Sequence, residues 1–599
     1  MNPPEQRLEI GDLDRHLAGL CVRLCGRDDP LLTHSIGLVC RMTGAGHTCV
    51  NLAAWAGKPL PGSANENAPA LAPWCEALWQ SGIVGRPGEV HPFILDETGR
   101  FYLYRYWAYE HALASDLLAR IGDPPAVDLP TLRQELDRFF PAGPGSEPNR
   151  QRTAAAVAAL QRFSLISGGP GTGKTSTIVR ILGLLLRLDE ARPGRIGLAA
   201  PTGKAAARMQ DAIRASRATL PLDESLRDAI PVEAATLHRL LGFKPGSVQF
   251  RHDRDNPLPV DVMVVDEASM VDLALMAKLV RAVPRKARLI LLGDKDQLAS
   301  VEAGAVLGDV CGGPSGFSPA FREILLQGAG DPGLQPGAPN GRGIQNCIVE
   351  LDHSYRFGEA SGIGRLARLI NRGAGRDART FLEQGASADV IWRNVASPLD
   401  LARRLAAETD FRPLLTAGTP EAALDALDRF RVLAAHRTGP FGVQFLNGRV
   451  EDALAARGLI RSAFPWYPGR PVLITANDYN LRLFNGDLGV GLSDPEGNYR
   501  VFFRGEQGVR CFPPARLPQH ETAFVMTVHR SQGSEAEEVL LILPSEASQV
   551  LTRELLYTAI TRARRRVQVW GTGPVVEAAV SRRLTRSSGL RDALWGAEP

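Results

Sequence analysis

Short apolar runs alternate along much of the chain with stretches whose apolar residues recur at helical spacing. Five of the runs predict buried strands, at residues 163–167, 196–200, 262–265, 289–292 and 539–543. After the first run the chain turns to a helical pattern, with apolar side chains at Ile178, Ile181, Leu182, Leu185 and Leu186. Strands that alternate with helices predict parallel sheets, whose ligands bind at the carboxyl ends of the strands. The sequence therefore predicts an α/β protein.

Residues 1 to about 110 form a first unit, which we expect to be mainly helical. Its helical patterns occur near residues 12–25, 30–42 and 68–82. Residues 93–104 predict a β-hairpin with a turn in its middle. Tryptophans and tyrosines concentrate in this unit, but it shows no catalytic constellation, so we interpret it as a partner-binding domain. Residues 111–150 are expected to be a helix and a linker, because 141–148 is rich in Pro and Gly.

The chain has 599 residues, enough for about three or four domains. Beyond the N-terminal unit we expect a first α/β domain over 151–345 and a second over 346–599. The stretch 311–345 is rich in Gly and Pro and only weakly patterned, which indicates a mobile insertion.

The second domain combines two kinds of pattern. The runs 432–435 and 472–475 predict strands of this domain. Between about 440 and 525 the segments alternate and are rich in Gly, with Asn485-Gly486 as a hairpin turn. This stretch predicts a small β-barrel inserted in the domain.

Composition narrows the class without fixing the function. A hydrophobic content of 44% and a charged content of 22% are typical of globular proteins. No apolar run of about 18 residues predicts a membrane helix, and the polar N-terminus lacks a signal-peptide core. The eight cysteines are scattered, so we expect reduced thiols and a cytoplasmic protein. A net charge of +4 is weak evidence for nucleic-acid binding.

The clearest motif lies between the strand at 163–167 and the helical pattern that follows it. Its residues are Gly168, Gly169, Pro170, Gly171, Thr172, Gly173, Lys174 and Thr175. Strand, glycine loop and helix are the context of a phosphate-binding P-loop, in which backbone N–H groups face the phosphates. Lys174 would reach the β- and γ-phosphates of ATP, and Thr175 would hold Mg²⁺. A plain tight turn is the alternative, but the flanking strand and helix favour nucleotide binding.

Polar residues after two later strands extend this prediction. Asp266 would bind Mg²⁺, and Glu267 would activate the attacking water. Gln297 follows the strand at 289–292 and can sense the γ-phosphate. Gln151 could hydrogen-bond the edge of adenine, although a solvated glutamine at a helix start explains its position equally well.

A second loop-to-helix junction carries Pro201, Thr202 and Lys204. Such a junction suits another phosphate, here of a nucleic-acid backbone, although an ordinary helix start is the alternative. The segment that holds His238 is similar in kind. Residues 243–257 lie between two strands and carry turn residues, so they could form a projecting hairpin or a surface loop.

The last part of the chain carries a further group of polar residues. Thr527, His529 and Glu535 precede the strand at 539–543. A helical pattern at 554–564 carries Arg562, and a guanidinium fixed across a cleft suits charge developing on a γ-phosphate. A structural salt bridge is the alternative for this arginine.

Taken in order, these motifs resemble those of superfamily-one DNA helicases, and most closely those of the RecD family, the alpha subunit of exodeoxyribonuclease V. The similar stretches are SGGPGTGKT, APTGKAAARM, DEASM, GDKDQL, SYRF, NGD, TVHRSQGSE, YTAITRAR and, more loosely, FYLYRYW. The resemblance covers nearly the whole chain. It implies two RecA-like P-loop domains with ATP between them.

The resemblance also implies residue roles. Gln151 is expected to read adenine, Tyr355 to stack on it and Glu535 to reach the sugar. The residues expected at the γ-phosphate are Gln297, Arg356 and Arg562. The residues expected near single-stranded DNA are Thr202, Lys204, His238, Thr527 and His529. Arg530 replaces a lysine that is usual in the family, so we leave it out of the site.

The resemblance further implies an ATP-dependent motor that moves 5′ to 3′ on DNA, acts at duplex ends in recombinational repair and assembles with RecB-like and RecC-like subunits. The short first unit favours such a subunit over the longer free-standing helicases. A nuclease is a competing hypothesis, but none of the seven lysines has an acid two residues before it, so this chain is not expected to cut DNA by PD-(D/E)xK chemistry. A P-loop switch protein without translocation is the third.

Overall fold

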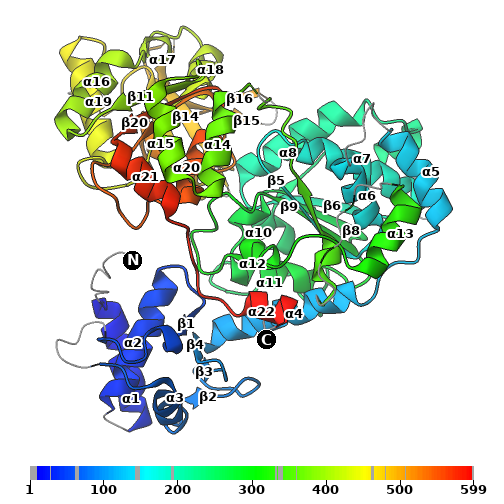
Figure 1. Ribbon diagram of the computed structural model, residues 1–599. Coiled ribbons are helices and arrows are strands. Elements are labelled where there is room, and N and C mark those ends of the chain that lie inside the picture. The colour runs from blue at the N-terminus through cyan, green and yellow to red at the C-terminus, as the bar shows by residue number, and fades with distance from the viewer. Residues whose placement is uncertain are drawn as a thin grey trace.

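The computed structural model shows an N-terminal unit and two larger α/β units (Figure 1). It describes residues 10–26, 29–60, 67–141, 149–189, 194–330, 334, 337, 342–358, 360–460, 465–478, 480–494, 496–505 and 508–596. Residues 142–148 of the predicted linker lie outside the described residues. Among the described helices, none is both long and apolar enough to cross a membrane.

The first α/β unit is built on a six-stranded parallel sheet in the order β10-β5-β9-β8-β6-β7. Its strands are β5 (Phe163–Gly168), β6 (Ile196–Ala200), β7 (Ala235–Thr236), β8 (Val262–Val265), β9 (Arg288–Gly293) and β10 (Ile348–Leu351). The four runs predicted as strands in this part of the chain are confirmed. Because β5 lies between β10 and β9, the glycine-rich loop leaves the sheet from an inner strand.

Helices cover both faces of this sheet. One face is packed by α5 (Leu129–Phe139), α6 (Arg150–Leu160), α7 (Lys174–Leu188), α8 (Gly203–Arg217) and α13 (Pro319–Ala329). The other face is packed by α4 (Tyr104–Ile121), α10 (Leu237–Leu241), α11 (Leu273–Ala282), α12 (Val306–Val310) and α22 (Leu590–Trp595). A short helix, α9 (Glu224–Asp228), lies beside α7.

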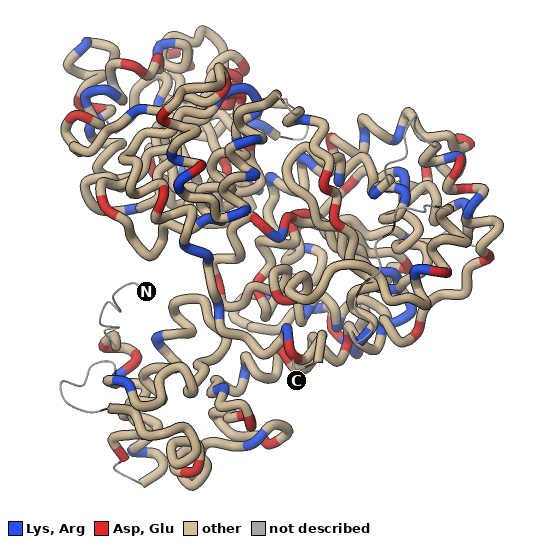
Figure 2. The backbone as a smooth tube through the Cα atoms, in the orientation of Figure 1, with Lys and Arg blue, Asp and Glu red and all other residues tan. Residues whose placement is uncertain are grey.

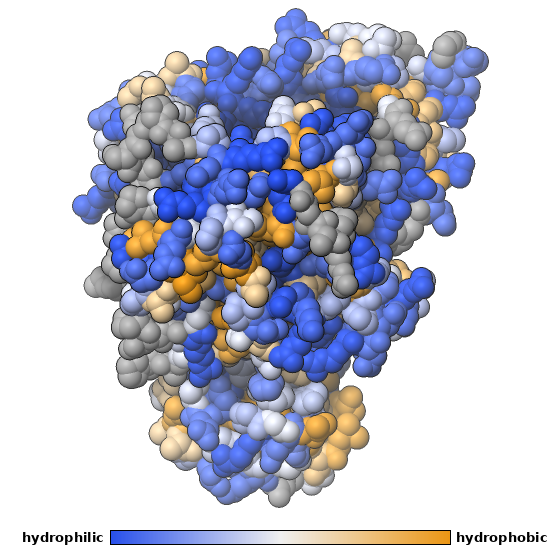
Figure 3. All heavy atoms as spheres, turned by 90° about the vertical axis from the view of Figure 1, so that its right-hand side faces the viewer, coloured by the Kyte–Doolittle hydropathy of each residue, from blue (hydrophilic) through white to orange (hydrophobic). Residues whose placement is uncertain are grey.

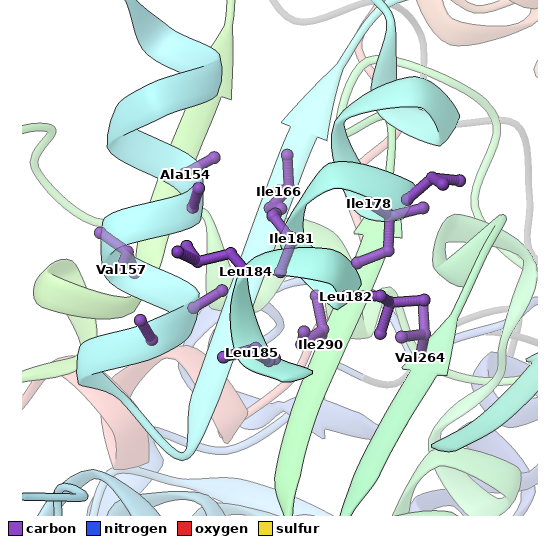
Figure 4. Packing of buried hydrophobic residues seen from close by; sticks show 14 of the residues in the cluster. Ala154, Val157, Ile166, Ile178, Ile181, Leu182, Leu184, Leu185, Val264 and Ile290 are labelled. Carbon is purple, nitrogen blue, oxygen red and sulfur yellow. The ribbon is translucent and has the colours of Figure 1, made fainter. Parts of the chain in front are cut away.

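The core under the glycine-rich loop is apolar and fully buried. Figure 4 shows Ala154 and Val157 of α6 and Ile181 of α7 beside Ile166 of β5, and all four side chains are fully buried. Burying a Val, Leu or Ile side chain stabilises a fold by about 1.5–3 kcal/mol. The small alanines of α6 let that helix lie close against α7, which fixes the helix that begins at the loop.

Two expectations about this unit were wrong. Within 311–345 the residues of α13 form a regular helix, which Ser318 caps and whose Phe321, Leu325 and Ala329 are buried against the core. The helix expected within 111–150 is present as part of α4, and both α4 and α5 pack on this unit. The boundary at 345 is too early, because β10 pairs with β5. The surrounding Gly and Pro residues had hidden the helical pattern of α13.

The second α/β unit has a five-stranded parallel sheet in the order β11-β20-β19-β12-β18. Its strands are β11 (Val390–Asn394), β12 (Phe430–Ala434), β18 (Val525–Thr527), β19 (Ala536–Ile542) and β20 (Ala563–Gly571). Its helices are α14 (Gly362–Arg372), α15 (Gly375–Gln384), α16 (Pro398–Glu408), α17 (Arg412–Leu415), α18 (Pro420–Arg429), α19 (Val443–Ala456), α20 (Arg553–Ile560) and α21 (Gly573–Ser581). Two parallel sheets covered by helices confirm the predicted α/β fold.

The predicted β-barrel is not confirmed. Five antiparallel strands are present in the order β16-β15-β14-β13-β17. They are β13 (Arg470–Ile474), β14 (Leu488–Ser493), β15 (Tyr499–Gly505), β16 (Gly508–Phe512) and β17 (His520–Thr522). Among the described residues, β16 and β17 do not pair with each other, so the inserted sheet is open. The run at 472–475 is confirmed as a strand of this unit, β13, which belongs to the inserted sheet.

The N-terminal unit combines helices with a small sheet. The helices α1 (Asp12–Cys25), α2 (Pro30–Gly44) and α3 (Leu71–Trp79) match the three predicted helical patterns. The strands β1 (Cys49–Asn51), β2 (Val84–Gly85), β3 (Phe93–Leu95) and β4 (Arg100–Leu103) form a sheet in the order β1-β4-β3-β2. The predicted hairpin is confirmed as β3 and β4, which pair antiparallel.

The C-terminal residues 582–596 return from the second α/β unit to the other two units, as the red segment of Figure 1 shows. Arg586 donates hydrogen bonds to the carbonyl oxygens of Ser300 and Gly304, both at 2.7 Å. The buried carboxylate of Glu110 accepts from Ser588 Oγ at 2.8 Å and from Gly589 N at 2.9 Å. The predicted second domain therefore ends earlier than residue 599, because its last helix, α22, packs on α4.

Candidate active site

The glycine-rich loop joins the carboxyl end of β5 to the first turn of α7, as predicted. Gly171 and Gly173 have φ angles of +79° and +80°, which only glycine adopts without strain. A Cβ on Gly171 would also collide with the side chain of Arg356. The loop therefore needs both glycines to turn back toward the helix. The first turn of α7 leaves its backbone N–H groups facing the loop, which is the arrangement that binds phosphate.

Lys174 lies at the start of α7 and its ammonium points back into the loop. The Nζ donates to the carbonyl oxygen of Gly168 and, at 3.1 Å, to that of Gly169. Burial raises the pKa values of Asp266 and Asp294, and the nearby charge of Lys174 offsets part of that rise. Lys174 is therefore close to both acids, as a residue that neutralises phosphate and metal-site charge must be.

The two acids after β8 occupy an unusual turn. Glu267 has a φ of +52°, one of two such non-glycine residues among those described. Its backbone N–H donates to Asp266 Oδ1 at 2.8 Å. Burial and the neighbouring charge of Glu267 raise the pKa of Asp266 to about 6. Strained backbone of this kind persists where the surroundings over-determine it, and here it presents two acids side by side.

Gln297 lies where the two α/β units meet. It follows β9, and its Nε2 donates to Asp294 Oδ2 at 2.9 Å. The same carboxylate accepts a hydrogen bond at 3.0 Å from the hydroxyl of Tyr557, on α20 of the second unit. Leu298 N donates to Thr558 Oγ1 at 2.9 Å. Asp294 and Tyr557 were missed by the sequence analysis, although an acid at the end of the strand beside β5 was a usable signal.

The segment after β10 lies over the glycine-rich loop. Tyr355 N donates to the carbonyl oxygen of Gly171 at 2.9 Å, and Gln151 Nε2 donates to that of Thr172 at 3.3 Å. A Cβ built on Gly173 would lie 2.7 Å from Gln151 Nε2 and 3.7 Å from Tyr355 Cε2. Gln151 and Tyr355 thus meet at one edge of the loop, and Tyr355 is 69% exposed there. An exposed ring beside an amide suits a purine base, for stacking and edge recognition.

Arginines from both units converge on Glu535, which precedes β19. Arg356 donates to it through two bonds, NH1 to Oε1 at 2.8 Å and NH2 to Oε2 at 3.0 Å. Burial alone would raise the pKa of Glu535, but the charges of Arg356 and Arg208 lower it to about 2. Arg208 on α8 is a further residue that the sequence analysis missed, although it lies one helical turn after Lys204.

Arg562 is buried near the same group, but not where we expected it. Helix α20 ends at Ile560, so Arg562 lies in the turn between α20 and β20. Its Nε donates to the carbonyl oxygen of Thr558 at 3.1 Å. The helical pattern continued too far in the sequence because Ala563 and the residues after it are also compatible with a helix. Arg562 nevertheless lies at the junction of the units, because its charge lowers the pKa values of both Arg208 and Glu535.

A cavity of about 2120 Å³ lies between the first unit, the second unit and the inserted sheet. Figure 2 shows basic and acidic segments where these parts meet. Lys204 lines the cavity together with Thr236, and a Cβ on Gly203 would touch the ring of Phe484, in the connection between β13 and β14. Burial and the nearby Arg431 lower the pKa of Lys204 to about 7.

The other predicted DNA contacts are spread more widely. Thr202 caps α8 by accepting from Ala205 N at 3.2 Å, and Pro201 precedes it. His238 packs edge-on against Phe250, with ring centres 5.7 Å apart. Thr527 ends β18, and burial lowers the pKa of His529 just after it. His238, Thr527 and His529 do not line the cavity with Lys204.

The residues present fit a magnesium nucleotide. Thr175 in the first turn of α7 offers a hydroxyl, and Asp266 offers a carboxylate. Mg²⁺ prefers such oxygen ligands and keeps several waters, so it is often held by one or two protein groups. The described residues contain no cluster of three or more His, Cys, Asp or Glu that could hold a metal by itself.

Comparisons with known proteins agree with this arrangement. Three family models match: the "RecBCD enzyme subunit RecD, N-terminal domain" over residues 6–102, the "AAA domain" over 151–303 and the "UvrD-like helicase C-terminal domain" over 522–569.

Similar relatives match over most of the chain. RecBCD enzyme subunit RecD of Mycobacterium tuberculosis (strain ATCC 25618 / H37Rv) is 41% identical over 98% of this chain and 94% of its own length. The same subunit of Haemophilus influenzae is 34% identical, covering 86% of this chain and 84% of its own. The ATP-dependent RecD2 DNA helicase of Deinococcus radiodurans is 32% identical over 83% of this chain but only 59% of its own. The chain belongs to the family of the RecBCD enzyme subunit RecD.

Proposed function

We propose that this chain is an ATP-dependent DNA helicase that moves 5′ to 3′ and acts as the RecD-type subunit of a helicase–nuclease at duplex ends. The observation that carries the proposal is the site at the junction of the two parallel-sheet units. The glycine-rich loop belongs to the first unit, whereas Tyr557 and Glu535 reach it from the second. A site that both units complete can change their relative position when its contents change.

Within this site each residue has a distinct task. Lys174 and the N–H groups at the start of α7 hold the β- and γ-phosphates, while Thr175 and Asp266 hold Mg²⁺. ATP with Mg²⁺ supplies the bond whose hydrolysis drives the motor. Glu267 accepts a proton from the attacking water. Gln151 and Tyr355 hold the base.

Arginines of both units would offset the negative charge that develops during the reaction. Arg562 and Arg356 stabilise the negative charge that develops on the γ-phosphate oxygens. Gln297 senses the same γ-phosphate oxygens. It can transmit their presence to the second unit, because Gln297 and Tyr557 both donate hydrogen bonds to Asp294. Glu535, now bound to Arg356, would instead reach the nucleotide's sugar when Arg356 turns to phosphate. Exchange of these partners couples hydrolysis to movement between the units.

Single-stranded DNA would lie across both units. Thr202, Lys204 and His238 of the first unit and Thr527 and His529 of the second would contact its backbone. Contacts of this kind bind without regard to sequence and weaken with salt. A motor that alternates its grip between the two sets moves along the strand. Such work on chromosomal DNA would be done in the cytoplasm.

Two related functions compete with this one. A free-standing RecD-like helicase would unwind DNA alone, and a P-loop switch protein would bind nucleotide without translocating. The partner subunits expected here resemble RecB and RecC, because relatives that match over nearly their full length are named as subunits of that enzyme.

The deciding experiment is the ATPase rate of the purified chain with and without single-stranded DNA, alone and with co-expressed RecB-like and RecC-like subunits. The helicase proposal expects stimulation by DNA and the subunit proposal expects co-purification. A rate that DNA leaves unchanged would favour the switch protein. Stimulation and full unwinding without partners would favour the free-standing helicase.

A further inference from the structure

Helix α1 of the N-terminal unit has apolar side chains on two faces. Ala18 and Val22 face the core of the unit and are buried. Four leucines lie on the opposite face, and their exposed fractions are 81% for Leu13, 39% for Leu17, 46% for Leu20 and 78% for Leu24. Figure 3, which shows a different face of the molecule from the one that carries these leucines, also has apolar surface on the N-terminal unit at its lower end. We call the four residues the leucine seam.

The spacing of the seam indicates what covers it. The leucines follow one another at intervals of four, three and four residues, the pattern of the a and d positions of a coiled coil. Such a row presents side chains that fit between those of a second helix crossing at a shallow angle. A flat sheet or an extended peptide would not match this spacing. The shape of the face therefore favours an α-helix as its partner.

The charges beside the seam indicate the polar groups of that helix. His16 and Arg23 lie seven residues apart and border the leucines on one side. The nearest acid on that side, Asp12, already binds Arg15 at 2.6 Å. Charged residues that flank a coiled-coil seam select partners of opposite sign. A partner helix with acidic residues along that edge is therefore favoured.

The size of the seam argues against a simple pairing of two copies of this chain. Four leucines expose on the order of a few hundred Å², whereas a stable interface buries about 1,200–2,000 Å² in total. The seam alone is too small for a dimer and suits one part of a larger contact between different subunits.

We propose that the leucine seam of α1 is the docking site for an amphipathic α-helix of another subunit, whose apolar heptad positions cover the four leucines and whose acidic edge faces His16 and Arg23. This inference rests on the proposed function, since it names a contact of the expected assembly. The exposed leucines, and not the aromatic side chains, form the partner surface of this unit. Trp74 is fully buried and donates to Ser35 Oγ at 2.9 Å, and Trp55, Trp79 and Trp107 are partly buried.

The test uses the full chain co-expressed with the RecB-like and RecC-like subunits of the same organism. The double variant Leu13→Glu, Leu24→Glu changes the two most exposed seam residues. The variant Val90→Glu is the matched control, because Val90 is also 81% exposed in this unit but lies outside α1. Thermal unfolding and ATPase activity of each purified chain check that the fold and the motor are intact.

We expect the double variant to reduce the co-purified partners about tenfold or more, with unchanged unfolding temperature, while Val90→Glu retains them. Full retention by the double variant would overturn the inference and leave the proposed function intact. Failure of the unchanged chain to bind the subunits would contradict the proposed function itself.

Two other occupants predict different results. If a second copy covers the seam, the unchanged chain sediments as a dimer and the double variant as a monomer. If residues 1–9 cover the seam, deletion of these residues and the double variant should lower the unfolding temperature equally. Both changes should then leave partner binding unchanged. Either result would overturn the inference.

Discussion

Arg356 and Glu535 form a two-bond ion pair across the junction of the α/β units, at 2.8 Å and 3.0 Å. Arg356 follows the edge strand β10 of the first sheet, and Glu535 precedes β19 of the second. Both side chains are mostly shielded from water, with exposed fractions of 25% and 13%. The pair therefore links the two units directly beside the glycine-rich loop.

In our account Arg356 leaves Glu535 for the γ-phosphate during the reaction. Replacing it, as in Arg356→Ala, should lower the turnover of ATP by about 10³-fold or more, because a guanidinium no longer offsets the developing charge. ATP affinity should change far less. Single-turnover kinetics and nucleotide titration measure the two effects. The control Arg565→Ala removes an exposed arginine that pairs with Glu537, and it should leave turnover unchanged. Near-normal turnover in Arg356→Ala would contradict this role.

Glu267 is expected to activate water, so Glu267→Gln should keep ATP binding and slow hydrolysis by about 10²–10⁴-fold. Lys174→Gln should abolish measurable hydrolysis, because the ammonium neutralises charge on the transferred phosphoryl group. Glu302→Gln is the control, since Glu302 is an exposed acid outside the site. DNA-stimulated ATPase assays compare the three. A Glu267→Gln enzyme that hydrolyses ATP at the normal rate would remove Glu267 from the mechanism.

The pKa of Lys204, lowered to about 7, gives DNA binding a definite pH dependence. A backbone phosphate binds the charged ammonium, which predominates below pH 7 and is progressively lost above it. Affinity for single-stranded DNA should therefore fall as the pH rises from 6 to 8, by at most tenfold per unit from this group. Fluorescence titrations at constant salt measure it. In Lys204→Ala, binding should weaken for all sequences alike and this part of the pH dependence should disappear. An unchanged profile would show that Lys204 does not contact phosphate.

The predicted hairpin at 243–257 is present only as a single bridge between Phe243 and Phe250. Val248 is 75% exposed, whereas Phe250 is buried. If the exposed part separates strands at a duplex junction, Val248→Ser combined with Phe243→Ser should reduce unwinding and spare DNA-stimulated ATPase. Phe250→Ala should instead destabilise the fold by about 3–5 kcal/mol, because it leaves a cavity. Normal unwinding by the Val248 and Phe243 variant would identify the segment as an ordinary surface loop.

Local patterns predicted four of the six strands of the first sheet and the glycine-rich loop, because each is specified by a short stretch of residues. The glycines at 171 and 173 are required by the turn itself. The contact between Asp294 and Tyr557 was not predictable in this way, since it joins residues 263 positions apart on two different units. The sheet to which 472–475 belongs depends likewise on pairing with β14 and β17.

The residues at which helices and strands end were also not predictable from the sequence. Nothing in the residues after Ile560 breaks the helical pattern, yet the chain turns there so that β20 can pair with β19. Because the pairing of β19 and β20 ends α20 early, Arg562 lies in a turn and not in the predicted helix. The open inserted sheet has a similar origin, because alternation of apolar residues predicts strands but not whether the edge strands meet.

Strand separation that depends on ATP and on the polarity of the tail tests the proposed function most directly. Duplexes with a 5′ tail or a 3′ tail are incubated with the unchanged chain or with Lys174→Gln, each in the presence of the co-expressed partner subunits. To exclude the motor of a partner, the partner complex without this chain is measured alongside. The account predicts that the unchanged chain adds ATP-dependent unwinding of the 5′-tailed duplex, and that Lys174→Gln adds none. Equal unwinding of that duplex with and without this chain would contradict it.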